Sequence, residues 1–198
     1  AAGGGNITVT TRGASGTTAT GGNITQTDAK LLTATTGTVT LATGDTASIG
    51  TAQNSAGNVN TTAATVVASA GSGGLFLGET NGAAFTVTAL LGGAVNVLND
   101  GGTLQIAGAS GSATGAVTLA SQGAVDVQNT LTTTGVGGTI TINANTVGAD
   151  ADGYTQGAFL IASGDTSANA VKITVNDNAA GSGTAQLDAI TAAAGGNI

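Results

Sequence analysis

Short segments in which apolar residues alternate with polar ones follow one another along nearly the whole chain. Gly37-Thr-Val-Thr-Leu is typical, because one residue separates Val39 from Leu41, and in an extended strand both side chains then point to the same face. The segments are about four to eight residues long, which is the length of a strand. They predict an all-β protein with strands at residues 6–11, 23–27, 38–43, 75–79, 84–91, 94–99, 103–108, 116–121, 124–129, 139–145, 158–163 and 171–176.

Helix is disfavoured throughout, because Gly and Thr are poor helix formers and occur in every part of the chain. The segment AQLDAITAAA at residues 185–194 is the exception, since it has the composition of a helical turn or two. We therefore expect at most one short helix, near residue 190.

Glycines open many of these segments at a recurring distance. The interval from Gly93 to Gly115 nearly equals that from Gly102 to Gly123, so that residues 93–107 align with 115–129 glycine on glycine and apolar on apolar. Interleaved series of this kind are typical of a solenoid with more than one strand per coil. They predict a parallel β-helix, or β-solenoid, with irregular coils of about 20 residues. The further pairs in the series are Gly115 with Gly138, Gly138 with Gly157, Gly5 with Gly22, and Gly37 with Gly57.

An antiparallel β-sandwich or jelly roll is the alternative fold. Asn81-Gly82 lies between the apolar segments 75–79 and 84–91, and Asn-Gly between such segments is a strong hairpin signal. Asp100-Gly101-Gly102 is a second candidate turn. The same residues also suit solenoid corners, which need positive φ angles.

The whole chain, residues 1–198, is expected to form one β-rich repeat domain. The sequence AAGGGNI at residues 1–7 recurs as AAAGGNI at 192–198. This match predicts that the chain is about one unit of a longer tandem array.

Composition excludes several classes of function. The chain has 198 residues and a net charge of −7, with three basic residues and neither His nor Cys. Zinc sites built from Cys and His, disulfides, and catalysis by Cys or by a Ser–His pair all lose a required member. Arg12, Lys30 and Lys172 are too few for a nucleic-acid footprint. No apolar segment approaches the ~20 residues of a membrane helix, so we expect no enzyme, no cofactor, no nucleic-acid partner and no membrane insertion.

Asp150 and Asp152, in the segment GADADGY, form the densest acidic spot and are candidate calcium ligands, since hard cations bind clustered carboxylates. The spacing of an EF-hand loop is not met, and Asp165 and Asp177 are possible additional ligands from a neighbouring coil. Tyr154 lies beside the pair and is the candidate aromatic residue for a glycan-binding face.

Asn6, Asn23 and Asn60 each begin an Asn-x-Thr triplet and are candidate glycosylation sites. Thr-x-Thr pairs, which form the flat faces of ice-binding solenoids when they stack, occur at residues 8 and 10, 25 and 27, 38 and 40, 86 and 88, and 139 and 141. Their uneven intervals predict no regular ladder.

The segments GNITVT (5–10), GTVTLA (37–42), GAVTLAS (115–121) and GTITINA (138–144) resemble the strand repeats of filamentous-haemagglutinin-type adhesins and autotransporter passengers. The resemblance covers most of the chain but rests on short motifs. It implies a right-handed parallel β-helix that is secreted across an outer membrane and used in adhesion. Neither the secretion domain of that family nor an Arg-Gly-Asp tripeptide is recognisable, because Ala14 follows Arg12-Gly13.

The first functional hypothesis is therefore structural: an extracellular segment or subunit of a stalk, fibre or filament at a prokaryotic cell surface. Its partners would be copies of itself, end to end or side by side. Pro and Lys usually prevent an edge strand from pairing with another chain, and this chain has no Pro and only Lys30 and Lys172. The alternative is an adhesin module whose lateral face binds a glycan or a surface. An ice-binding solenoid is the third hypothesis.

Overall fold

The computed structural model describes residues 4–11, 21–27, 30–52, 56–89, 93–147, 151–176 and 182–198. These residues form strands joined in a single sheet. The strands are β1 (Ile7–Thr10), β2 (Leu32–Ala42), β3 (Val59–Ala70), β4 (Leu75–Glu79), β5 (Ala83–Ala89), β6 (Val95–Asn99), β7 (Leu104–Ile106), β8 (Ser110–Ser112), β9 (Val117–Ser121), β10 (Val125–Val127), β11 (Leu131–Thr133), β12 (Ile140–Ala144), β13 (Tyr154–Gln156), β14 (Ile161–Ser163), β15 (Val171–Val175), β16 (Ala185–Gln186) and β17 (Ile190–Ala192).

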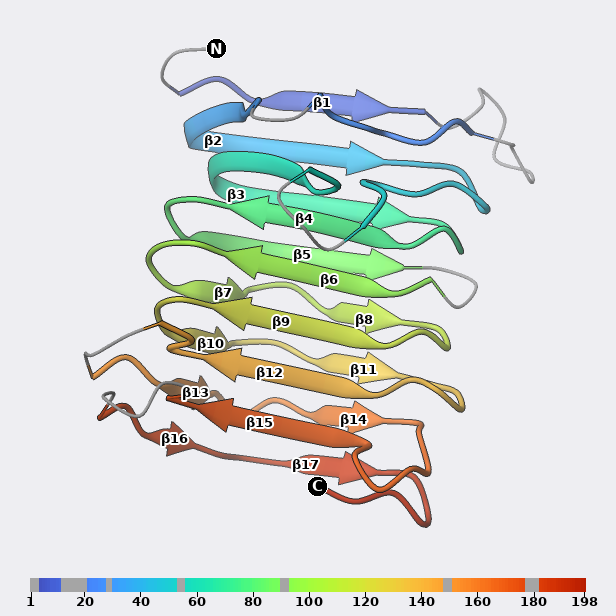
Figure 1. Cartoon of the computed structure of the whole chain (residues 1–198), viewed down its shortest axis with the longest axis vertical. Coiled ribbons are helices and arrows are strands. Elements are labelled where there is room, and N and C mark those ends of the chain that lie inside the picture. Colours follow the sequence, from blue (N-terminus) through green and yellow to red (C-terminus); the bar gives the residue numbers. More distant parts are fainter. Residues whose placement is uncertain are drawn as a thin grey trace.

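The chain winds as a parallel β-solenoid with two faces (Figure 1). The front face stacks β4, β6, β9, β12 and β15, and each pairs in parallel with the next. The back face stacks β1, β2, the second part of β3, and β5, and then the pairs β7/β8, β10/β11, β13/β14 and β16/β17. The N- and C-termini consequently lie at opposite ends of the stack.

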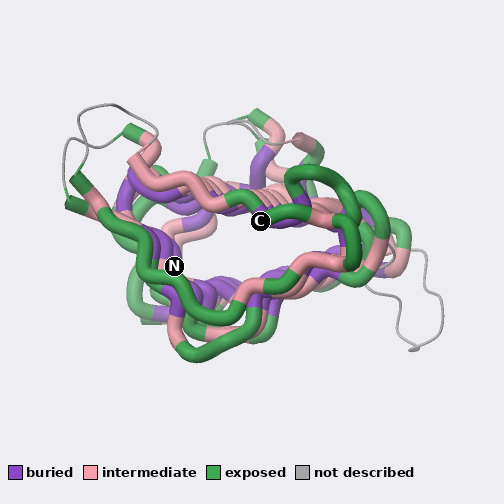
Figure 2. Tube along the Cα trace, turned by 90° about the horizontal axis from the view of Figure 1, so that it is seen from below, coloured by how far each residue is buried: buried purple, intermediate pink, exposed green. Residues whose placement is uncertain are grey.

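The core consists of columns of apolar residues, one from each coil, between the two faces. The first front column is Ile24, Ile49, Leu75, Val95, Val117, Ile140 and Val171. A back column is Ile7, Val39, Val66, Phe85, Ile106 and Val127. Viewed along the axis, the coils superpose as a flattened ring (Figure 2). Because strand side chains alternate between faces, one apolar residue in two suffices to fill this narrow interior.

The predicted fold class and the clearest repeats are confirmed. Val95 faces Val117 and Leu104 faces Val125, which is the register expected from Gly93 over Gly115 and Gly102 over Gly123. Val117 likewise faces Ile140, as Gly115 over Gly138 requires.

The other glycine pairs do not mark successive coils. Ile140 faces Val171, which lies well beyond the segment that follows Gly157. Val39 faces Val66 rather than Val59, and Ile7 faces Val39 rather than Ile24. Longer corner segments lengthen these coils, so a fixed period of about 20 residues, typical of the shortest solenoid repeats, holds only in the middle of the chain.

The antiparallel alternative is wrong. β4 pairs with β3 and β6, whereas β5 pairs with β3, β7 and β8, and all of these pairings are parallel. Asn81-Gly82 and Gly101-Gly102 instead form neighbouring corners of the stack. Gly82 has φ +76° and Gly102 has φ +65°, so glycine supplies the left-handed corner and no hairpin forms.

The expected short helix near residue 190 is also absent from the described structure. The segment 185–194 contains β16 and β17, each of which pairs in parallel with the coil before it. Pairing with the neighbouring strands holds this segment extended, and this pairing outweighs the helix propensity of its Ala residues.

Candidate functional site

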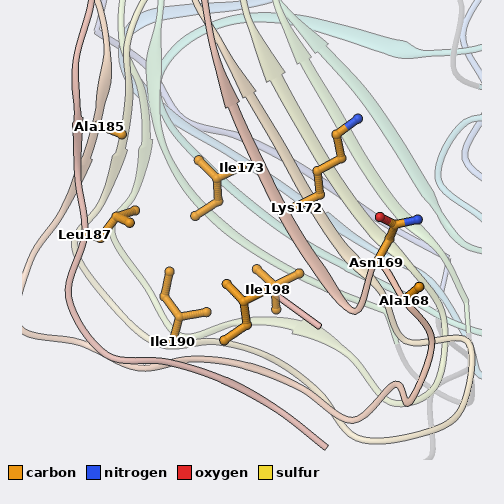
Figure 3. Close-up of a pocket in the computed structure, with 9 residues that line it drawn as sticks. Ala168, Asn169, Lys172, Ile173, Ala185, Leu187, Ile190 and Ile198 are labelled. Carbon is orange, nitrogen blue, oxygen red and sulfur yellow. The ribbon is translucent and has the colours of Figure 1, made fainter. Parts of the chain in front are cut away.

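The C-terminal end of the solenoid leaves its apolar interior open. A hollow of about 450 Å³ lies there, lined by residues from β15, β17 and the segments next to them. In Figure 3, Ile173, Leu187, Ile190 and Ile198 gather around the space between the two faces. Leu187 is 58% exposed and Ile198 69%, although both lie where interior columns would continue. This end is therefore an uncovered cross-section of the core.

The N-terminal end shows the same feature. Ile7 and Val9 of β1 and Leu32 of β2 are only partly buried, although they pack against the core. Among the described residues, β1 pairs with β2 alone, so its other edge carries backbone groups that are available to a further parallel strand.

Asp150 of the candidate calcium pair lies outside the described residues, as does Asp177. Asp152 is half-buried in the segment before β13, at a corner where a Cβ on Gly123 would lie 3.2 Å from its Oδ2. Within the described ranges, no three acidic side chains gather in a way that could hold a metal ion. Calcium binding stays a prediction.

Asp165 does not turn toward Asp152 but closes its own corner. Its Oδ1 accepts the Gly137 N–H at 2.9 Å, and its Oδ2 accepts the Ser167 N–H at 3.2 Å and the Ser167 hydroxyl. The Ser167 hydroxyl, followed by the Gly137 N–H, lowers the pKa of the Asp165 carboxyl below its ordinary value. This carboxylate therefore joins two coils.

The three candidate glycosylation sites have different surroundings. Asn6 and Asn23 are exposed, and each side-chain oxygen accepts a backbone N–H from the next coil at 2.9 Å, from Thr38 and Ser48 respectively. Asn60 is half-buried inside β3, and its backbone N–H donates to Gln26 Oε1 at 2.7 Å. The side-chain oxygens of Asn6 and Asn23 are thus held by the backbone of the next coil, Asn60 is held within the sheet, and glycosylation stays a prediction.

Tyr154 is buried, so its ring is not offered to a glycan at the surface. Its hydroxyl donates to Gln156 Oε1 at 3.2 Å, and Gln156 Nε2 donates to the carbonyl oxygens of Phe159 (2.8 Å) and Ala189 (3.0 Å). Gln156 stands in the column of Val127, which makes the interior polar near the last coils.

The Thr-x-Thr pairs partly share a column on the outer surface of the back face. Thr8 faces Thr40, but Val67 separates Thr40 from Thr86. As expected from the uneven intervals, the described strands show no continuous threonine ladder.

Buried polar residues at the corners were not anticipated from the sequence. Thr61, Glu79, Asn99 and Ser121 form one row, in register from coil to coil. Asn99 Nδ2 donates to Ser121 Oγ at 2.9 Å and to the Gly102 carbonyl at 3.0 Å. Ser112 and Ser163 act similarly at the opposite corner, where each hydroxyl donates to a glycine carbonyl and accepts a backbone N–H. These groups satisfy corner backbone rather than present chemistry to a substrate.

The signal for this row was present in the sequence. The polar residue lies two positions after an inward-pointing Leu or Val, and so points inward as well, in Leu77-Gly78-Glu79, Val97-Leu98-Asn99 and Leu119-Ala120-Ser121. Each therefore had to be buried once the register was known.

No family model, curated protein or solved structure matches this chain. Among the described residues no helix is long and apolar enough to span a membrane. The described residues thus form a parallel β-solenoid, while the resemblance to adhesins stays a prediction.

Proposed function

We propose that the chain is an extracellular structural protein, a segment or subunit of a surface stalk, fibre or filament held by continuous β hydrogen bonding. One observation carries the proposal: among the described residues, parallel pairing runs from β1 to β17, and apolar residues at both ends of this stack, such as Ile7 and Leu187, are partly or largely exposed. A sheet that ends in open edges and exposed core residues favours continuation by another strand.

The local chemistry supports the same role. Each coil contacts only the coils beside it, so length is added without redesigning the core. Corner residues such as Glu79, Asn99 and Asp165 each form a side-chain hydrogen bond with the neighbouring coil. The chain carries few charges for its length, which lowers repulsion between closely packed copies.

Electron microscopy and fibre diffraction of the concentrated full chain test this function. We expect filaments with an axial reflection near ~4.8 Å, the spacing of adjacent strands, because the hydrogen bonds run along the axis. Filaments without that reflection, or particles no longer than one molecule at every concentration and ionic strength, would contradict the proposal. Val136→Lys is a suitable control, since Val136 is 81% exposed on a turn away from both ends.

A further inference from the structure

We infer that the partner at the C-terminal end is the N-terminal end of a second copy, stacked in parallel register so that Ile198 fills the level between Val171 and the second copy's Ile24. This inference rests on the proposed function and specifies its joint. The choice of a second copy follows from the register of the strands at the two ends of the stack.

Asn197 and Ile198 lie in register with the start of the front strand β15, although no strand is formed there. At each step of the front column the N–H of the column residue donates to the carbonyl preceding its partner, as Ile140 does to Ala170 at 2.9 Å. Val171 donates to Asn197 in the same way, at 3.1 Å. Ile198 therefore stands opposite Val171, in the column that Ile24 begins at the other end.

The structural counterpart of Ile198 is thus Ile24, and the surrounding sequences agree. Gly-Gly-Asn-Ile occurs at 21–24 and again at 195–198. Ile7, which the longer sequence match pairs with Ile198, lies on the back face. The longer match therefore relates Ile7 on the back face to Ile198 in the front column, and the tandem array stays a prediction.

The two ends complement each other by half a coil. The C-terminal end finishes with the back strands β16/β17 and with Asn197 and Ile198, while the N-terminal end starts with the back strand β1. Placing β1 of a second copy on β16/β17 sets Val9 over Ile190 and Ile7 over Leu187, in the columns that these residues already occupy. The second copy's Ile24 then lies over Ile198.

The chain already contains one place where a continuous strand pairs with two short strands, as β1 would pair with β16/β17. β5 is continuous, yet it pairs with the broken pair β7/β8. Phe85 and Thr88 of β5 are closer in sequence than their partners Ile106 and Gly111, so the broken pair carries extra residues between its two halves. The step from Leu187 to Ile190 exceeds the step from Ile7 to Val9 by a single position, so β1 on β16/β17 has a smaller mismatch to absorb.

A contact between two different ends is heterologous and does not close, so it generates a filament rather than a dimer. A joint of this kind buries Ile190, Leu187 and Ile198 of one copy against Ile7 and Val9 of the next. It also supplies a parallel partner for the open edge of β1.

Engineered cysteines test the register directly, because the natural chain has none. Thr10 and Thr191 are exposed on the outer surface of the back face and share one column. In the proposed joint their Cα atoms lie ~4.8 Å apart, within the range that a disulfide spans. We expect Thr10→Cys/Thr191→Cys to form a ladder of covalent oligomers on mild oxidation. Thr10→Cys/Thr174→Cys, with its second thiol on the front strand β15, should not.

Variants that block one end test the polarity of the joint. Val9→Lys and Ile190→Lys each bury a charge at the joint, so we expect each alone to raise the critical concentration for filaments by about tenfold or more. A mixture of the two should form a one-to-one dimer, because each retains one intact end. Circular dichroism identifies any variant that fails to fold, and the cysteine pair then still decides.

The outcomes separate this inference from the proposed function. Filaments that persist in both lysine variants and give no Thr10–Thr191 cross-link would overturn the end-to-end joint and leave the structural role in place. A wild-type chain that never assembles would overturn both. Dimers formed by either lysine variant alone would indicate a symmetric contact and would also overturn the joint.

Discussion

The Thr61 hydroxyl donates to the Glu79 carboxylate across two adjacent coils, and neither side chain is exposed to solvent. The other carboxylate oxygen accepts the N–H groups of Ala63 at 3.3 Å, Thr80 at 3.1 Å and Asn81 at 3.3 Å. One acidic side chain therefore organises the corner between β4 and β5, beside β3.

Replacing this carboxylate by an apolar group should destabilise the fold strongly. We expect Glu79→Leu to cost about 3 kcal/mol or more, because several buried donors lose their acceptor. Glu79→Gln keeps one acceptor oxygen and should cost about 1–2 kcal/mol. Urea unfolding followed by circular dichroism measures the difference, with Thr61→Val as the variant that removes a single donor. Equal midpoints for Glu79→Leu and wild type would contradict this account.

Gly111 in β8 cannot carry a side chain. Its φ is +146°, and a Cβ there would lie 1.8 Å from the carbonyl oxygen of Thr132 in the next coil. We expect Gly111→Ala to cost about 3 kcal/mol or more, because the two coils must separate to admit a methyl group. Gly22→Ala is the matched control, since a Cβ at Gly22 meets nothing within 4 Å. Thermal unfolding compares the two, and a normal melting temperature for Gly111→Ala would refute the close approach.

Tyr154 is the sole tyrosine and should resist ionisation. Burial, followed by the negative charge of Asp126, raises the pKa of Tyr154 above its ordinary value. The folded state thus prefers the neutral phenol, so this preference is fully present below pH ~10 and is lost as pH rises through the folded pKa. We expect tyrosinate absorbance to appear at higher pH in the native chain than in urea. Asp126→Asn should reduce the difference in pH between the native and the urea titrations. Coincident native and urea titrations of the wild-type chain would show that Tyr154 is solvated.

Asp165 should make the molecule sensitive to acid. Because hydrogen bonds lower the pKa of Asp165 in the folded state, its contribution is present above pH ~4 and is lost as pH falls through the lower folded pKa. Melting temperature between neutral pH and strong acid should therefore fall less in Asp165→Asn than in wild type. Ser167→Ala, which removes the leading hydrogen bond, should reduce the slope in the same sense. Parallel profiles for all three proteins would contradict the assigned cause.

The sequence pattern predicted many of the strands whose inward residues are large and apolar, but it missed β11 and β13, although Leu131 and Tyr154 are buried there. Val95, Val117 and Ile140 follow glycines at nearly equal spacing, so both the strands and their stacking could be derived from local pattern alone. Coils that contain longer corner segments broke the spacing, because an insertion at a corner shifts the glycine series without altering the register of the core columns.

Two further strands, β8 and β3, were missed because small and polar residues predominate in them. β8 is Ser-Gly-Ser and has no apolar signal, yet it pairs with β5 and β11 because the strands on both sides offer it a complete ladder. β3, the longest described strand, is rich in Thr and Ala, and it turns a corner by pairing first with β4 and then with β5. In both cases neighbouring coils determine the conformation.

The sequence could predict that the sheet has edges able to pair with another strand, but not where these edges lie. A lack of Pro and a scarcity of Lys suggested open edges, whereas their location required the winding to be known. The assignment of Ile198 to the column of Ile24 depends on one backbone hydrogen bond, from Val171 to Asn197. The repeated Gly-Gly-Asn-Ile agrees with this assignment but does not by itself identify the column.

The orientation of the ladder also has a mechanical consequence. Because the hydrogen bonds run along the axis, with β1 and β17 at opposite ends, we expect a force applied along the axis to open the outermost coil first and to leave the rest intact. Leu75 and Val95 mark one such coil. Release of a coil of about 20 residues lengthens the chain by roughly 70 Å, at ~3.5 Å per residue. The molecule should therefore yield under load in a series of small steps of unequal length, absorbing work coil by coil instead of rupturing at once.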